Sequence, residues 1–342
     1  GLPNEPELKV EDVAVDTVVE DIKEEPKEVE VTETADGGAE ISFDPNAVEP
    51  VSSSHSQNLA ELLDDAILDP LGSKLVDDYK DYRASRKDWE DCYRNGLDLL
   101  GFKYERRTEP FKGASGVTHP VLSEAVTQFQ AQAYKELLPS DGPVRTQILG
   151  AQTPQKQDQS NRIKDFMNYQ IMDQMKEYEP EFDQMLFYLP LSGSTFKKVY
   201  YDDLLGRAVS KFIPADDLVV PYSATSLDDA EAVVHVIKMS ENDLRKQQVN
   251  GFYKDVDLAQ PAMQTDDITK KEQEIEGVKQ TKQDDIYTLL ECHVNVDLEG
   301  FEDMGADGMP TGIKLPYVIT VEEGSRQVLS IRRNYKEGDS KK

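Results

Sequence analysis

The period of the hydrophobic pattern changes once along the chain, and this change limits the possible folds more than any other feature of the sequence. Between residues 73 and 189, apolar side chains recur at steps of three and four, which indicates amphipathic helices. From residue 196 onward they alternate with polar residues or form short apolar runs, which is typical of strands. Helices followed by hairpins of antiparallel strands predict a helix-rich α+β domain.

The first helices are expected between residues 58 and 101. A short helix covers residues 58–66, and Pro70 and Gly72 then interrupt the pattern. Ser73 is expected to cap a long helix of about seven turns that ends near Gly101. Its apolar stripe consists of Leu75, Tyr79, Tyr82, Trp89, Tyr93, Leu97 and Leu100.

Three more helices are expected after Pro120. The first stops at Pro139, the second covers residues 154–178, and the third covers residues 181–189 and is closed by Pro190. The first is expected to bury Leu122, Val126, Phe129, Ala133 and Leu137. The stripe of the second is Ile163, Met167, Ile171, Met175 and Tyr178.

Strands are expected in five further places, two of them as hairpins. Ser240 and Asp243 have the spacing of a helix cap, and the helix that they begin is expected to end at Asn250 and Gly251. Residues 257–285 are polar and form an expected exposed insertion. The expected strands cover residues 145–149, 196–201 with 208–212, 233–239, 287–296, and 317–321 with 328–332.

The first 54 residues carry nearly half of the net negative charge. They contain 16 acidic residues and 3 lysines, a net charge of −13 against −29 for the whole chain, and their one aromatic residue is Phe43. Such a segment buries too little apolar surface to offset the entropy lost on ordering it. We therefore expect residues 1–56 to be a disordered acidic arm, which docks to a partner, mimics DNA, or is simply solvated. The folded domain is expected over residues 57–335, with a tail at 336–342.

Composition argues against several classes of protein. The 67 acidic residues outnumber the 38 basic ones, which opposes binding to nucleic acid in general and to anionic membranes. No apolar run is long enough for a membrane-spanning helix, and the start of the chain does not resemble a secretory signal. The chain begins with Gly1 instead of Met, which is typical of a processed product or a fragment. Cys92 and Cys292 are far apart, so we expect a reduced, intracellular type of protein without a disulfide scaffold.

The search for catalytic chemistry gives no candidate. No phosphate-binding loop and no HExxH motif occurs, and Gly113 to Gly116 fit a flexible loop better than a nucleotide site. His293, Asn295 and Asp297 alternate along an expected strand, where a solvated face is a better interpretation than a metal site. His119 is expected to be a loop histidine. We therefore assign no catalytic, cofactor-binding or metal residue and no cofactor.

Adjacent like charges are common but do not point to a site. Neighbouring acids on a helix do not face each other, so they fit a solvated surface better than a catalytic pair of carboxylates. The basic pairs are too few to form a groove that follows a phosphate backbone. The acidic pairs are Asp64-Asp65, Asp77-Asp78 and Asp216-Asp217, and the basic pairs are Arg106-Arg107, Lys197-Lys198 and Arg332-Arg333.

Five sequence blocks occur in a particular order between residues 112 and 303. They are KGASGVTHPVLSEAV (112–126), FQAQAYKELLP (129–139), LPLSGSTFKKVYYD (189–202), FIPADDLVVP (212–221) and LECHVNVDLEGFED (290–303). In this order they resemble the N-terminal half of portal proteins, the head-to-tail connectors of short-tailed, cyanophage-like bacteriophages. The resemblance covers about residues 70–335.

The resemblance implies a structural protein and not an enzyme. Portal subunits form a ring, usually a dodecamer, at one vertex of the capsid, and DNA enters and leaves through its channel. The implied partners are further copies of the chain, the major capsid protein, the terminase, tail or adaptor proteins, and double-stranded DNA that passes through and is bound weakly. The implied location is the portal vertex of the virion, after assembly in the host cytoplasm, with no membrane involved.

The chain departs from the family pattern at its end, and a second function remains open. It would supply mainly the portal wing, because residues 336–342 end before the stem and the clip are expected. The alternative is an acidic protein-binding scaffold or a nucleic-acid mimic without a channel. A portal is expected to continue beyond residue 342 into a long helix and further strands, which would distinguish it from the scaffold.

Overall fold

In the computed structural model the chain divides into two compact units, Gly1–Ser54 and His55–Lys342. The structure describes residues 55–100, 111–114, 119–202, 205–258, 286–305 and 308–336, and the backbone of two short strands in the first unit. The expected insertion at 257–285 beyond residue 258, and the expected tail beyond residue 336, lie outside the described residues.

The first unit contains a hairpin that was not expected in the acidic arm. Strand β1 (Glu30–Glu33) pairs antiparallel with β2 (Ala39–Ser42), with Glu30 opposite Ser42. Both segments contain β-branched residues, which favour strands. The disorder of the rest of the arm stays a prediction.

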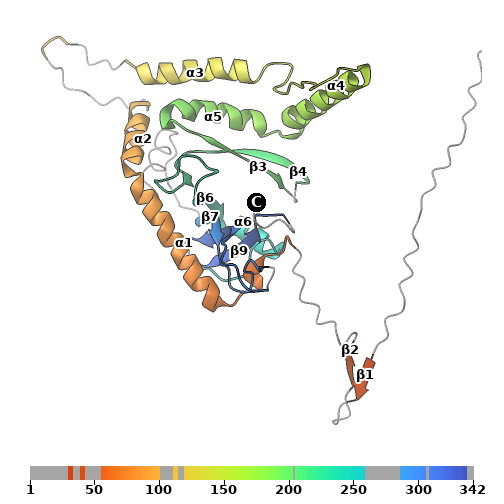
Figure 1. The fold of residues 1–342 in the computed structure, drawn as a ribbon. Helices are drawn as coiled ribbons and strands as arrows, with labels where there is room; N and C mark the ends of the chain where they lie inside the picture. The colour runs from red at the N-terminus through yellow and green to blue at the C-terminus, as the bar shows by residue number, and fades with distance from the viewer. Residues whose placement is uncertain are drawn as a thin grey trace, which may run out of the picture. The chain divides into compact units, whose positions relative to one another are not determined.

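A five-stranded antiparallel sheet forms the centre of the second unit (Figure 1). Its spatial order is β5-β6-β7-β8-β9, which is also the order along the chain. The strands expected at 233–239, 287–296, 317–321 and 328–332 are all present. The five strands are β5 (Leu218–Val219), β6 (Ala232–Ser240), β7 (Ile286–Val296), β8 (Leu315–Glu322) and β9 (Val328–Arg333).

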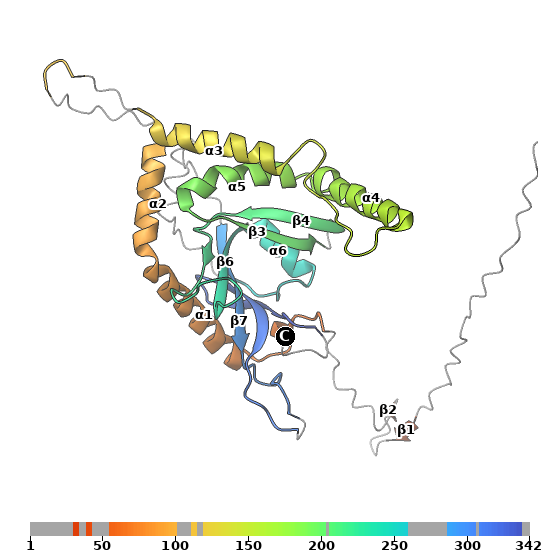
Figure 2. The ribbon, with the colours of Figure 1, turned by 45° about the horizontal axis from the view of Figure 1, so that its top comes forward.

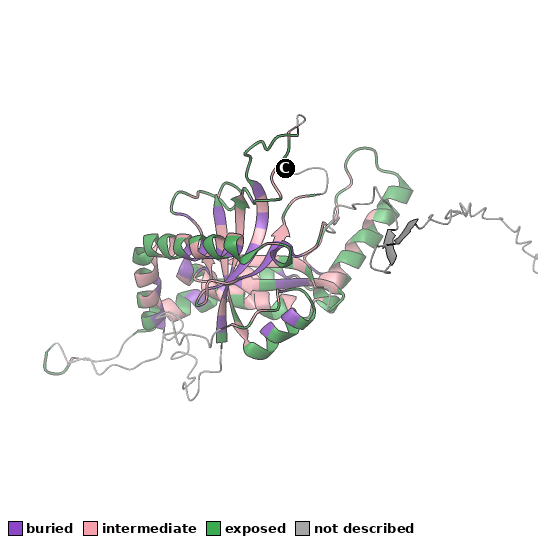
Figure 3. Ribbon diagram, turned by 90° about the horizontal axis from the view of Figure 1, so that it is seen from below, coloured by how far each residue is buried: buried purple, intermediate pink, exposed green. Residues whose placement is uncertain are grey.

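Both faces of this sheet are covered, so its strands hold nearly half of the buried hydrophobic residues in the described part of the chain (Figure 3). Helix α1 (Asp65–Ser85) packs Leu75, Val76 and Tyr79 against one face, in a cluster that also contains the short helix η1 (Leu59–Glu61). On the other face, α6 (Glu241–Val249) inserts Leu244 among apolar side chains of β7 and β9. The expected cap of α6 is confirmed, because the Ser240 hydroxyl accepts a hydrogen bond from the Asp243 amide at 3.2 Å.

The free edge of β9 is closed by a side chain. The Asn58 amide donates to the Leu329 carbonyl at 3.0 Å, and its oxygen accepts from the Ile331 amide at 2.9 Å. The same oxygen accepts from the Ala60 amide at the start of η1. Asn58 therefore pairs with β9 as a neighbouring strand would, which protects an edge that could otherwise join another chain.

The expected interruption at Pro70 and Gly72 is wrong. Helix α1 begins at Asp65 and continues through both residues. Pro70 is exposed, so water can bind the Ala66 carbonyl that the proline leaves without a donor. Gly72 is buried, and a Cβ there would lie 2.2 Å from the Arg326 carbonyl oxygen. Glycine therefore lets the helix approach the turn between β8 and β9 and does not mark a helix end.

The expected long helix is instead two helices, since α1 ends at Ser85 and α2 (Lys87–Leu100) follows. Arg86 separates them with φ −101° and ψ 11°. The aromatic stripe spans both helices and is partly buried, with Tyr79, Tyr93 and Leu97 in the core. Trp89 donates to the Ser192 carbonyl at 3.0 Å, which ties α2 to the next layer.

That layer consists of α3 (Val121–Leu137), α5 (Tyr178–Ser192) and a hairpin of β3 (Phe196–Asp202) and β4 (Arg207–Ile213). The expected hairpin is confirmed, and α5 lies between it and α3 (Figures 1 and 2). The expected end of α5 at Pro190 is wrong. Pro190 is exposed within the helix, which ends at Gly193 with a positive φ of 82°.

Two further expectations between residues 145 and 178 are wrong. Residues 145–149 form no strand, since no described strand pairs with them, and Thr146 instead accepts a hydrogen bond from the Ser160 hydroxyl of α4 (Pro154–Tyr169) at 2.8 Å. The helix expected to reach residue 178 ends earlier, in the π-helical turn η2 (Gln170–Gln174). Asn168 holds this arrangement by accepting from the Val144 amide at 2.9 Å, and it leaves no room for a side chain at Gly142.

Candidate functional site

A row of polar side chains crosses the sheet on the face that carries α6. The strand register places His235 opposite Glu291, Glu291 opposite Thr320, and Thr320 opposite Ser330. We call these four residues the polar row. Since facing residues on neighbouring strands lie side by side on one face, the row is continuous from β6 to β9.

The polar row is joined to the hairpin by an ion pair. Lys198 of β3 reaches across with its Nζ at 2.5 and 2.6 Å from the two carboxylate oxygens of Glu291. His293, two residues further along β7, lies 3.0 Å from the same carboxylate. The Glu291 side chain is only 15% exposed, so this contact is a largely buried link between two parts of the fold.

Burial and the neighbouring charges shift the pKa values of Glu291 and His235. Burial by itself raises the pKa of Glu291, but hydrogen bonds from His293 and Lys198 and the positive charge of Lys198 outweigh it and lower the pKa to about 2. Burial, with the nearby Lys198 charge, lowers the pKa of His235 to about 4. At neutral pH the carboxylate is therefore ionised and His235 is uncharged.

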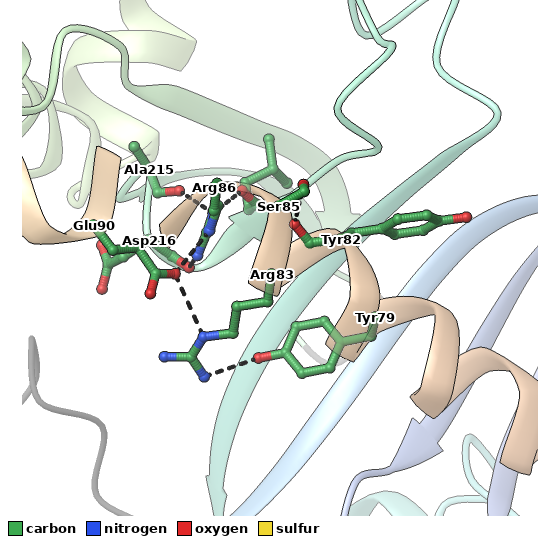
Figure 4. Close-up of polar contacts among 9 residues, drawn as sticks. Tyr79, Tyr82, Arg83, Ser85, Arg86, Glu90, Ala215 and Asp216 are labelled. Carbon is green, nitrogen blue, oxygen red and sulfur yellow. Dashed lines mark hydrogen bonds and ion pairs between the residues drawn. The ribbon is translucent and has the colours of Figure 1, made fainter. Parts of the chain in front are cut away.

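Arg86 forms a second polar centre at the junction of α1 and α2 (Figure 4). Its guanidinium donates to the carbonyls of Ala215, Asp216 and Leu218 at 3.0, 2.5 and 2.8 Å, and to Glu90 at 2.9 Å. Five donors on a planar group suit several acceptors at once. Arg86 thus fixes the segment before β5, which belongs to the fourth of the sequence blocks.

A pocket of about 480 Å³ opens between α1 and the neighbouring strands β6 and β7. Apolar and polar side chains both line it, and buried Cys292 lies among them with a pKa that burial raises to about 12. A thiol with this pKa is a poor nucleophile. The charged residues that line the pocket are Lys74, Asp78, Glu231, Asp297 and Lys314.

Helix α4 carries an apolar face that no described residue covers. None of its residues is buried, and Phe166 is 58% exposed. Ile163 and Met167, two residues of the expected apolar stripe, are 45% and 41% exposed. We call Ile163, Phe166, Met167 and Tyr169 the α4 apolar face.

Helix α3 is also less buried than expected. Of its five stripe residues only Val126 is fully buried, and Phe129 and Leu137 are exposed. Polar contacts join α3 to α5 instead, because Gln130 donates to the Asp183 carboxylate at 2.8 Å and Tyr134 hydrogen-bonds to Glu179. The layer of α3 and α4 therefore presents more apolar surface to solvent than its sequence pattern predicts.

The alternating residues His293, Asn295 and Asp297 are not brought together. His293 contacts Glu291, whereas Asn295 and Asp297 line the pocket beside α1. Within the described ranges no three histidine, cysteine or acidic residues are placed to hold a metal ion. His119 lies in a loop before α3, as expected.

Two of the three basic pairs form contacts within the fold. Lys197 and Lys198 point to opposite faces of the hairpin, so Lys197 lies over the Tyr178 ring at 3.7 Å while Lys198 contacts Glu291. Arg332 and Arg333 donate to the carbonyls of Ser56 and His55. Arg106 and Arg107 lie outside the described residues.

Two of the acidic pairs take part in surface ion pairs. Asp65 contacts Lys254 at 3.0 Å, and Asp77 contacts Arg326 at 3.0 Å.

No helix in the part of the chain that the structure describes is long and apolar enough to cross a membrane.

Sequence reasoning missed the polar row and Arg86. A signal for the first was present, because Glu291 interrupts the apolar run from Leu289 to Cys292 on the face opposite Leu290 and Cys292. Nothing comparable marks Arg86, whose acceptors lie about 130 residues away.

The chain matches no protein-family model, and no curated protein matches it.

Proposed function

We propose that this chain is the wing-like part of a portal protein, a structural subunit of a ring at one vertex of a bacteriophage capsid. In this function the ring is the conduit for DNA packaging and ejection and the platform on which head and tail join. The proposal places the protein in the virion and includes no enzymatic activity. Its partners are further copies of the chain, capsid protein, terminase, tail or adaptor proteins and DNA in transit.

The observation that carries the proposal is the apolar surface of α3 and α4 that no described residue covers. Phe129 of α3 and Phe166 and Met167 of α4 are exposed, and Val126 of α3 is the one buried residue of these two helices. Contiguous exposed apolar surface marks contacts with other proteins. A subunit built to pack against its neighbours accounts for such helices.

The sequence blocks and the charge agree with this function. Blocks 189–202 and 290–303 meet in the Lys198–Glu291 ion pair, so segments far apart in the chain that resemble portals also contact each other. A net charge of −29 disfavours tight binding to phosphates, and a conduit for DNA must release it.

The test is the state of assembly of the full-length protein. We expect native mass spectrometry and negative-stain electron microscopy to show closed rings of identical subunits. A protein that stays monomeric at every concentration reached would rule out the portal function. The scaffold alternative predicts that monomer, together with binding of a basic partner that is lost when residues 1–54 are removed.

A second measurement concerns the absence of catalysis. The purified protein is expected neither to hydrolyse ATP nor to cut DNA, with or without Mg²⁺, and to bind duplex DNA weakly at physiological salt. ATP turnover that survives purification and disappears on changing a single acidic residue would contradict a purely structural role.

A further inference from the structure

The α4 apolar face has the features of a surface that docks into another protein. Positions 163, 166 and 169 share one side of the helix because they are three residues apart. Arg162 lies on the same side, and its side chain is 74% exposed. The helix has three basic and two acidic residues, a positive balance in a chain of net charge −29.

The pocket beside α1 has the complementary features. The apolar part of its lining comes from Leu71 and Leu75 of α1 and from Val294 and Val296 of β7, and its volume of about 480 Å³ is enough for large side chains. Asp78, Glu231 and Asp297 give its lining more negative than positive charge. The adjoining loop adds Asp228 and Asp229, both exposed.

The two surfaces lie at opposite ends of the unit formed by residues 55–342. Helix α1 is at one end and α4 at the other in both Figure 1 and Figure 2. Complementary patches at opposite ends allow head-to-tail association, which repeats from one subunit to the next and closes into a ring when the rotation permits. A contact between two α4 helices would instead stop at a dimer.

We propose that the α4 apolar face of one copy of this chain docks over the pocket beside α1 of the next copy, with Phe166 as the anchoring side chain and Arg162 facing the acidic rim. This inference rests on the proposed ring function and names the two surfaces that would build the ring. An aromatic residue entering a pocket, with a charged pair at its edge, is the usual composition of an energetic centre in a protein interface.

Two variants of the full-length protein test the contact. Phe166→Asp disables the α4 apolar face, and Asp78→Arg reverses the charge at the pocket. Phe166 is on the exposed side of a helix with no buried residue, and Asp78 lies at the rim of the pocket, so both proteins are expected to keep the wild-type melting temperature. The matched controls are Asn161→Asp elsewhere on α4 and Asp69→Arg on α1 outside the pocket.

Each variant alone is expected to weaken association by more than about tenfold, while the two controls assemble as the wild type does. An equimolar mixture of the two variants is expected to give a one-to-one complex and nothing larger. In that complex the intact α4 of the Asp78→Arg chain occupies the intact pocket of the Phe166→Asp chain, and both remaining surfaces are disabled.

The possible failures are distinguishable. A wild-type protein that does not assemble would refute the ring function itself. If both the wild type and Asp78→Arg form rings, the ring function stands, but the pocket is not the contact surface. If each variant is folded and does not assemble alone, but their mixture gives no complex, the pairing of these two surfaces is wrong.

Discussion

Replacing Glu291 by Gln should loosen the hairpin of β3 and β4 from the central sheet. The change keeps the size of the side chain but removes the charge that Lys198 contacts at 2.5 Å. Breaking a buried ion pair on one side destabilises a protein by about 3–5 kcal/mol. A pKa of about 2, against 4.5 for a free glutamate, independently corresponds to about 3 kcal/mol. Lys198 is 29% exposed, so solvent screening lowers the expected loss to about 2–3 kcal/mol.

The stability lost on replacing Glu291 should decrease as the pH falls. Because folding lowers the pKa of Glu291, its stabilisation is complete above about pH 4.5 and is lost as the pH falls towards about 2. His235 adds an earlier phase, since its pKa falls from 6.5 to about 4 on folding. Its contribution is complete above about pH 6.5 and is lost as the pH falls towards about 4.

Urea denaturation at a series of pH values measures both phases. The wild type and Glu291→Gln should differ most near neutral pH and converge near about pH 2, whereas His235→Asn should lack the phase that begins near about pH 6.5. Exposed Glu299→Gln is the control and should stay within about 0.5 kcal/mol of the wild type. A double-mutant cycle with Lys198→Met isolates the pair. Equal stability of Glu291→Gln and the wild type at neutral pH would refute the reasoning.

Two further predictions concern side chains that hold distant segments together, and a third concerns the acidic arm. Arg86→Ala should lower the free energy of unfolding by about 3 kcal/mol, because three carbonyls at the start of β5 lose a charged donor. Arg94→Ala, a half-buried arginine of α2 paired with nearby Asp91, should cost less, and equal effects of the two would contradict the role of Arg86. Asn58→Ala should cost about 2 kcal/mol in urea denaturation, since it leaves the buried edge of β9 without partners, and a neutral result would show that water replaces the side chain. Limited proteolysis should remove residues 1–54 first and leave a resistant remainder, because a lone two-stranded hairpin is marginally stable in water; protection of residues 5–45 would show that the β1–β2 hairpin is stable by itself.

The sequence by itself was sufficient for the α+β class and for most strands. Alternation of side chains is a local property of a strand, so the segments at 233–239 and 287–296 could be located without knowing what covers them. The cap at Ser240 was equally predictable, because a hydroxyl that accepts from an amide three residues later needs no distant partner.

Where helices end, and what their apolar stripes contact, was decided by the tertiary structure. Pro70 and Gly72 look like an interruption, but an exposed proline and a glycine packed against the Arg326 carbonyl are both compatible with α1. The break at Arg86 depends on carbonyls about 130 residues away, which no local pattern contains. A helical period likewise predicts that α4 has an apolar side, but whether that side is covered within the chain or by another molecule depends on which segments fold against it.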